Sequence, residues 1–98
     1  MSEERRHLAK MFHKKFAAIP DEQWCIYVLE FDGARCALGH TMGETLYDTE
    51  ETKKLRELFG GTRDSDRPAI INNGDSCMYK QPTPKARILA ALEDIIRQ

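Results

Sequence analysis

Residues 24–38 read WCIYVLEFDGARCAL, and this stretch decides between two classes of fold. Its first eight residues are rich in aromatic and β-branched side chains, which favour a strand. The dipeptide Asp32-Gly33 follows at once and supplies the positive φ of a tight turn, so we expect a return strand over residues 35–38. A buried helix beginning at Asp21 would show a similar apolar run. The stretch therefore predicts an α+β fold, with an all-helical fold as the alternative.

Amphipathic helices are expected at both ends of the chain. From Ser2 to about Ala18, and again from Pro84 onward, apolar residues recur at spacings of three and four, which places them on one face of a helix. Pro20 ends the first helix, because the residue before a proline avoids the helical conformation, and Thr83 can cap the last one. Each helix should bury its apolar face against the rest of the domain.

The middle of the chain predicts a third helix, from about Thr49 to Phe59. Asp48 and Glu51 have the spacing of a capping box at its start, and a pair of glycines ends it. These elements make one small domain over residues 1–98. In this domain the terminal helices pack with the middle helices around a short β-hairpin.

Size and charge limit what the chain can do. Its 98 residues suffice for one domain, and its formal net charge of −1 offers no long-range field that would attract nucleic acid or an anionic membrane. No apolar run approaches the roughly 20 residues of a membrane span, and the N-terminus lacks an apolar signal core. We therefore expect a cytoplasmic protein that does not enter a membrane.

Cys36 and His40 are the first candidates for chemistry. They are four residues apart, so on a helix the thiol and the imidazole would share a face. A thiolate beside an imidazolium is how cysteine nucleophiles are activated, and Asn73 could orient the imidazole as a third member. A free cysteine more often packs as a small buried apolar residue. We therefore predict no catalytic residue, with a cysteine-dependent enzyme using these three residues as the alternative.

The three cysteines also suggest a metal site. Cys25, Cys36 and Cys77 form a Cys3His set with His40, which would suit a structural zinc ion. The intervening segments of 10, 3 and 36 residues lack the close Cys-x2-Cys pairs of recognisable zinc motifs. An odd number of cysteines fits free thiols in a reducing compartment. We expect no metal or other cofactor, with zinc at these four residues as the alternative.

Basic side chains give the candidate binding residues. Arg6, Lys10 and Lys14 lie on the face of the first helix opposite its apolar residues, and Arg63 and Arg67 lie in the polar loop that follows the third helix. Such residues would serve an acidic protein partner or a phosphate backbone. We predict a protein partner, with nucleic acid as the second choice. A homodimer would cover apolar residues that the terminal helices leave exposed.

The order of three short motifs resembles that of a known family. WC at 24–25 is followed by CALG at 36–39, then by NNGD at 72–75 and a terminal helix led by Thr-Pro. This order resembles a family of small uncharacterised proteins from bacteria and their phages. His40 stands where that family has a small residue. The resemblance implies a cytosolic or phage-encoded domain in which the cysteine, glycine and Asn-Asp positions are held together.

These features predict a small, cytosolic, non-catalytic protein-interaction module. The motivation is that a small and nearly neutral chain carries no P-loop, dinucleotide fingerprint, zinc-protease pair or kinase motif. With the resemblance, the module would be encoded by a phage or mobile element and would act on a host component. A cysteine-dependent enzyme and a small zinc-stabilised binding domain are the alternatives.

Overall fold

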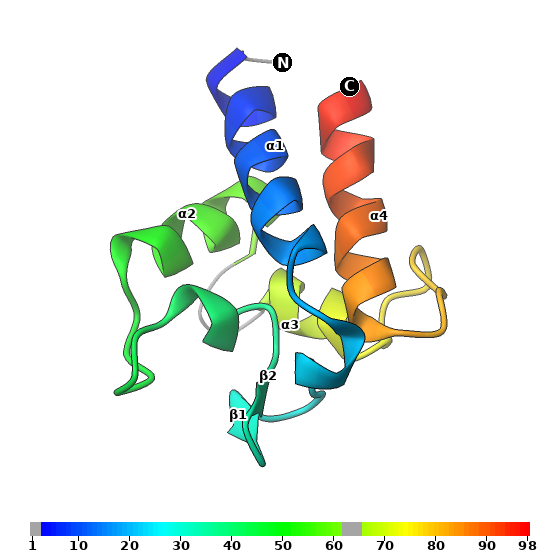
Figure 1. Ribbon diagram of the computed structural model, residues 1–98. Helices are drawn as coiled ribbons and strands as arrows, with labels where there is room; N and C mark the ends of the chain where they lie inside the picture. Colours follow the sequence, from blue (N-terminus) through cyan, green and yellow to red (C-terminus); the bar gives the residue numbers. More distant parts are fainter. Residues whose placement is uncertain (1–2, 62–65) are drawn as a thin grey trace.

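Two long helices lie side by side in the computed structural model, which describes residues 3–61 and 66–98 (Figure 1). The start of α1 (Glu3–Ala17) and the end of α4 (Pro84–Arg97) lie together at one end of the molecule, and a two-stranded hairpin lies at the other. The remaining elements are η1 (Asp21–Gln23), β1 (Glu30–Phe31), β2 (Ala34–Arg35), η2 (Gly39–Thr41), α2 (Glu50–Phe59) and α3 (Arg67–Asn72).

The contact between α1 and α4 forms the centre of the core. Phe12 and Phe16 from α1 and Ile88 and Leu92 from α4 are all fully buried, as their helical spacing predicts. Burial of each such side chain contributes about 1.5–3 kcal/mol. The Thr83 hydroxyl accepts the N–H of the third residue of α4, so the predicted cap is present. Both terminal helices are therefore confirmed to within a residue or two.

The third predicted helix is present as α2, but its N-cap is Thr49 rather than Asp48. The Thr49 hydroxyl accepts the Thr52 N–H (3.2 Å), and the Thr52 hydroxyl accepts the Thr49 N–H (3.1 Å). Thr52 is fully buried and accepts a further hydrogen bond from the Thr41 hydroxyl at 2.9 Å. Asp48 instead forms an ion pair with Arg56. The hydrogen bond between Thr41 and Thr52 thus accounts for a cap at Thr49 instead of Asp48.

The predicted strand over residues 24–31 forms only at its end. β1 pairs with β2 in an antiparallel hairpin, while Trp24 makes an isolated parallel bridge to Arg35. The residues between are bends, because Tyr27 has a φ of 67° and its N–H bonds to the side chain of Asn73 instead of to a strand. The prediction of one long strand is therefore wrong. The return strand is also shorter than expected, since β2 ends at Arg35.

The CALG stretch forms a tight turn that leads into η2. Gly39 lies directly against the backbone of the preceding loop, and a Cβ atom on it would fall 2.3 Å from the Leu29 carbonyl oxygen. No side chain fits that space, which explains glycine at this position. Leu38 and Met42 are buried on either side. The turn thereby packs the loop before the hairpin against the core.

An α+β fold is confirmed in outline. The described residues form four α-helices and one two-stranded antiparallel hairpin, so the domain is mostly helical, and the all-helical alternative fails at the hairpin. The fourth helix, α3, was not predicted from periodicity. Buried Arg87 of α4 caps its end by donating to the carbonyls of Ile71 and Asn72 (2.8–3.2 Å).

Candidate functional site

Four large apolar side chains are exposed beside the hairpin. Ile26, Tyr27, Val28 and Phe31 are 42–71% exposed, although they come from the most apolar stretch of the sequence. Single exposed apolar residues are ordinary, but several large ones within six residues favour an interaction surface. We call these four residues the hairpin patch.

The backbone of the hairpin patch is held by side chains that follow α3. The Tyr27 N–H donates to Asn73 Oδ1 (2.8 Å), and the Tyr27 hydroxyl donates to Asp75 Oδ1 (3.3 Å). The left-handed conformation of Tyr27 costs roughly 1–2 kcal/mol for a residue with a side chain. Strain of this kind persists only when surrounding contacts impose it. The hairpin patch is therefore a surface whose shape the rest of the fold imposes.

Asn72 ties the chain on both sides of the hairpin patch to α3. The Cys25 N–H donates to the Arg35 carbonyl at 3.1 Å, and the next rung of a parallel ladder would join the Cys25 carbonyl to the Ala37 N–H. The carboxamide of Asn72 takes that place. Its Nδ2 donates to the Cys25 carbonyl (2.9 Å), and its Oδ1 accepts the Ala37 N–H (3.0 Å). Asn72 is fully buried, and its hydrogen bond with the Ala37 N–H is shielded from water.

A pocket of about 200 Å3 opens beside the hairpin patch. Cys36 forms part of its wall, where its Sγ accepts the Gly39 N–H at 3.4 Å. A cavity of about 150 Å3 already holds a benzene ring, so this pocket has room for one apolar side chain. Its walls include Val28, Leu29, Cys36, Leu38, Ala69 and Asn73.

This end of the molecule is acidic. Two segments build the hairpin patch and much of the pocket wall. Residues 21–34 carry four carboxylates, residues 68–79 carry one, and neither segment contains a lysine, arginine or histidine. Of the adjoining cations, Arg35 and Arg56 form ion pairs with carboxylates, and Arg67, which follows Asp66 of the pocket in the sequence, is exposed. The carboxylates outside those ion pairs are Asp21, Glu22, Asp32 and Asp75.

The residues of the alternative nucleophilic site each have another role in the fold. Burial raises the pKa of the Cys36 thiol, which disfavours the thiolate. Burial also lowers the pKa of His40, whose Nε2 lies 2.9 Å from the Gln23 carbonyl oxygen. Asn73 holds the backbone of Tyr27. A thiolate and imidazolium pair needs the opposite shifts, so this geometry does not favour a cysteine nucleophile.

The four residues of the alternative zinc site do not form a ligand set. In the described part of the chain, no group of three or more His, Cys, Asp or Glu side chains is placed to hold a metal ion. Cys36 is buried, Cys77 is exposed, and Cys25 Sγ lies 3.4 Å from the Val28 carbonyl. Zinc at these residues stays a prediction that the geometry does not support.

The predicted basic binding residues are dispersed. Arg6 pairs with a carboxylate of α1 and donates to the last carbonyls at the end of α4, so it joins the two helices. Lys10 and Lys14 are exposed along a groove between α1 and α4. Arg67 is exposed at the start of α3, and Arg63 lies outside the described residues. Lys10, Lys14 and Arg67 are accessible, but they do not line one common pocket.

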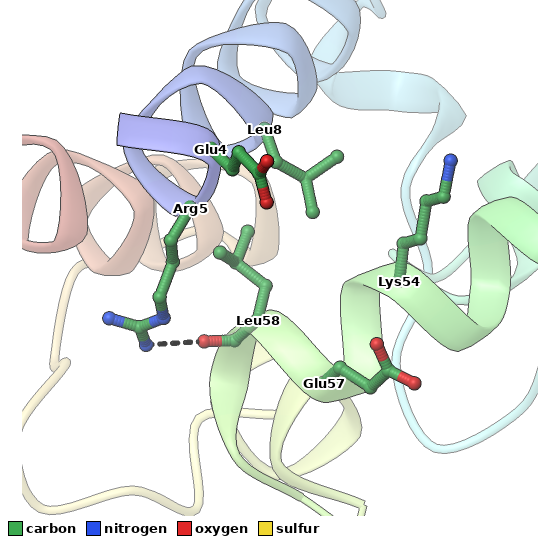
Figure 2. A pocket seen from close by; sticks show the side chains of 6 residues that line it. All are labelled: Glu4, Arg5, Leu8, Lys54, Glu57 and Leu58. Carbon is green, nitrogen blue, oxygen red and sulfur yellow. Dashed lines mark hydrogen bonds between the residues drawn. The ribbon is translucent and has the colours of Figure 1, made fainter. Parts of the chain in front are cut away.

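Another hollow surface lies between α1 and α2 (Figure 2). This groove of about 250 Å3 is crossed at one end by a hydrogen bond from Arg5 Nη2 to the Leu58 carbonyl (2.6 Å). Two acidic and two basic side chains alternate on its walls, so it has no net charge to select a partner. Its lining residues are Glu4, Arg5, Leu8, Lys54, Glu57 and Leu58.

The sequence did not reveal the hairpin patch, because the apolar and β-branched residues 24–31 predict a regular strand. Trp24 of the same stretch is 7% exposed and packs edge-on against Phe16. Two signals were available in the sequence. Carboxylates flank the apolar run closely, and the pair Asn72-Asn73 offers two side chains that can bond to a backbone outside regular strands.

Comparison with protein-family models, with curated proteins and with solved structures found no match for this chain. The resemblance drawn from the WC, CALG and NNGD motifs therefore stays a prediction. These motifs do lie together, since Asn72 bonds to Cys25 and Ala37. Across the residues described, no helix is long and apolar enough to span a membrane.

Proposed function

We propose that this protein is a small, non-catalytic protein-interaction module that binds its partner at the hairpin patch. One observation carries this proposal: four large apolar side chains within residues 26–31 are exposed on a backbone that Asn72 and Asn73 hold at Cys25 and at the left-handed Tyr27. A surface that is already shaped before binding loses less conformational entropy on association.

The composition of the hairpin patch supports this function. Tyr27 and Phe31 are the most exposed of its four residues, and aromatic side chains are frequent among the few residues that dominate binding energy. The pocket beside them adds a concave site next to these convex anchors. Convex aromatic residues beside a pocket are typical of the centre of a protein interface.

Crosslinking from two exposed aromatic positions tests the location of the interface. Phe31 is 71% exposed in the hairpin patch, and Tyr47 is 75% exposed outside it, so the two are matched in type and accessibility. A photoreactive phenylalanine analogue is placed at either position, and crosslinked proteins are identified in an extract of the source cells. A protein crosslinked from position 31 and not from position 47 is then purified.

Titration calorimetry with that purified protein then measures whether its affinity depends on the hairpin patch. We expect Phe31→Ser to weaken binding at least tenfold, because interface aromatic residues often contribute about 2 kcal/mol or more. Tyr47→Ser should leave the affinity unchanged. Equal affinities of the wild type and Phe31→Ser, with both proteins folded by circular dichroism, would show that the hairpin patch is not the interface.

A further inference from the structure

We propose that the partner presents a lysine- or arginine-rich peptide segment to the hairpin patch and inserts one of its apolar side chains into the adjoining pocket. This inference rests on the proposed function and specifies the chemistry of the partner. It follows from two independent features of the hairpin end, namely the size of the pocket and the sign of the charge around it.

The pocket selects a single apolar side chain. Its volume of about 200 Å3 exceeds the roughly 150 Å3 that holds a benzene ring. Its walls are mostly apolar side chains of the loop, the turn and α3, and its polar lining residues are already engaged, Asn73 with the Tyr27 N–H and Asp66 with Arg56 at 3.0 Å. Exposed Val28 borders both the pocket and the hairpin patch, so an inserted side chain would also contact the patch.

The charge around the hairpin patch selects cations beside that anchor. Asp32 follows Phe31 in the turn, and Asp75 accepts the hydroxyl of Tyr27, so both carboxylates lie at the border of the patch. Neither of the segments to which they belong contains a cation. Lysine or arginine side chains flanking the inserted residue would meet these carboxylates, which raises the association rate and excludes acidic competitors.

A second copy of this chain offers related chemistry but a poorer fit. On α1, exposed Met11 lies between Lys10 and Lys14. Docking of α1 onto the hairpin of another copy would be a head-to-tail contact, which leaves one free surface of each kind and continues into open chains unless a ring closes. A separate partner satisfies the hairpin end without such growth, and we therefore assign the site to another protein.

Selection from a display library of short random peptides tests this inference. The library is selected on the immobilised protein at low salt and, in parallel, on Phe31→Ser. A fluorescein-labelled peptide enriched by the wild type is then titrated by anisotropy against wild type, Ala69→Leu, which fills the pocket, and the double variant Asp32→Asn/Asp75→Asn. Ala69→Val, a smaller filling at the same pocket residue, replaces Ala69→Leu if that variant is less folded.

The expected result is enrichment of peptides in which one large apolar residue is flanked by lysine or arginine. Filling the pocket should weaken binding at least tenfold. The double variant should weaken it about threefold to tenfold at low salt and make the affinity less dependent on salt. Enrichment of neutral or acidic peptides, or equal binding to the pocket-filled variant, would overturn the inference and leave the interaction at the hairpin patch intact.

One further outcome of the peptide selection tests the proposed function, and a separate sedimentation experiment tests the identity of the partner. Equal enrichment by the wild type and Phe31→Ser would contradict the function at the hairpin patch, and the inference would fail with it. Sedimentation velocity of the chain alone shows whether a second copy of the chain occupies the hairpin patch. Self-association that Phe31→Ser abolishes would identify a second copy as the occupant and overturn the assignment to another protein.

Discussion

The two ends of this molecule are stabilised in different ways. At the helical end, α1 and α4 bury complementary apolar stripes, and Arg6 of α1 bonds to the last carbonyls of α4. At the hairpin end, the most apolar stretch of the chain is partly left in water, and buried polar side chains such as Asn72 hold its backbone. Apolar residues therefore build the core between α1 and α4, whereas four large ones are left exposed at the hairpin end.

This difference indicates which end is free to carry function. Side chains that supply core energy cannot also contact a partner, whereas Tyr27 and Phe31 contribute little to the core and stay accessible. The fold can keep them exposed because Asn72 and Asn73 supply the hydrogen bonds that a regular strand would otherwise provide. The comparison predicts a graded series of mutational effects.

Phe12→Ala should have the largest effect on stability. Phe12 is fully buried, and its ring stacks on Phe16 with centroids 5.7 Å apart. Removing a buried phenylalanine leaves a cavity and costs about 3–5 kcal/mol. Urea unfolding followed by circular dichroism measures the loss. Met11→Ala is the matched control, because Met11 is the neighbouring residue and is 47% exposed. Its loss should stay within about 0.5 kcal/mol, and similar losses for both variants would contradict the assignment of the α1 core face.

Asn72→Ala should have the next largest effect, and it should act at the hairpin end. The substitution leaves the buried Ala37 N–H without its partner, at about 1–3 kcal/mol, and the part-buried Cys25 carbonyl without its partner, at about 1 kcal/mol. We expect a total loss of about 2–4 kcal/mol in urea unfolding. Amide hydrogen exchange should become faster in residues 25–37 before it becomes faster in α4.

Asn73→Ala is the matched control for this prediction. Asn73 is half-buried, and its side chain accepts the exposed Tyr27 N–H, so its loss should cost about 1 kcal/mol. Equal losses from the two variants would mean that the carboxamide of Asn72 is not the main link between the hairpin end and α3.

The same contrast explains how much of the fold could be predicted. The spacing of Phe12 and Phe16, and of Ile88 and Leu92, is a local pattern that determines both helix type and buried face. The turn at 32–33 was likewise predictable, because Asp-Gly favours positive φ wherever it occurs. Local chemistry decides these elements, and the structure agrees with it.

The candidate site could not be predicted in the same way. Whether Ile26 or Val28 is buried depends on the conformation of Tyr27, which a side chain 46 residues away imposes. No periodicity in residues 24–31 records that contact. The basic residues were predictable as an exposed face of α1, but their hydrogen bonds were not, since Arg6 reaches carbonyls 90 and 92 positions away in the chain.

The pH dependence of the free energy of unfolding, a smaller effect, tests the environment of His40. Burial against Trp24 lowers the pKa of His40 below its ordinary value of 6.5, so the unfolded chain binds the proton more readily. The stabilisation should be complete above pH 6.5 and should be lost as pH falls toward the pKa of the folded protein. Unfolding at pH 7.5 and 5.5 measures this loss, which should be smaller in His40→Gln.

An NMR titration of the His40 ring provides the direct check. A pKa above 6.5 in the folded protein would contradict burial of a neutral imidazole. Such a value would require an anionic neighbour that stabilises the imidazolium, and a thiolate at Cys36 would be the first candidate. That single result would return the cysteine-dependent enzyme to consideration.

Phe31→Ser should have the smallest effect on stability. The ring is 71% exposed, so its removal should change the free energy of unfolding by no more than about 0.5 kcal/mol. Tyr47→Ser, at a ring 75% exposed, should behave alike in the same urea titration. A loss of more than about 1.5 kcal/mol for Phe31→Ser alone would place the ring in the core, on the scale of a buried side chain. The hairpin end would then be stabilised by apolar burial as the helical end is, and its most exposed aromatic residue would not be free to contact a partner.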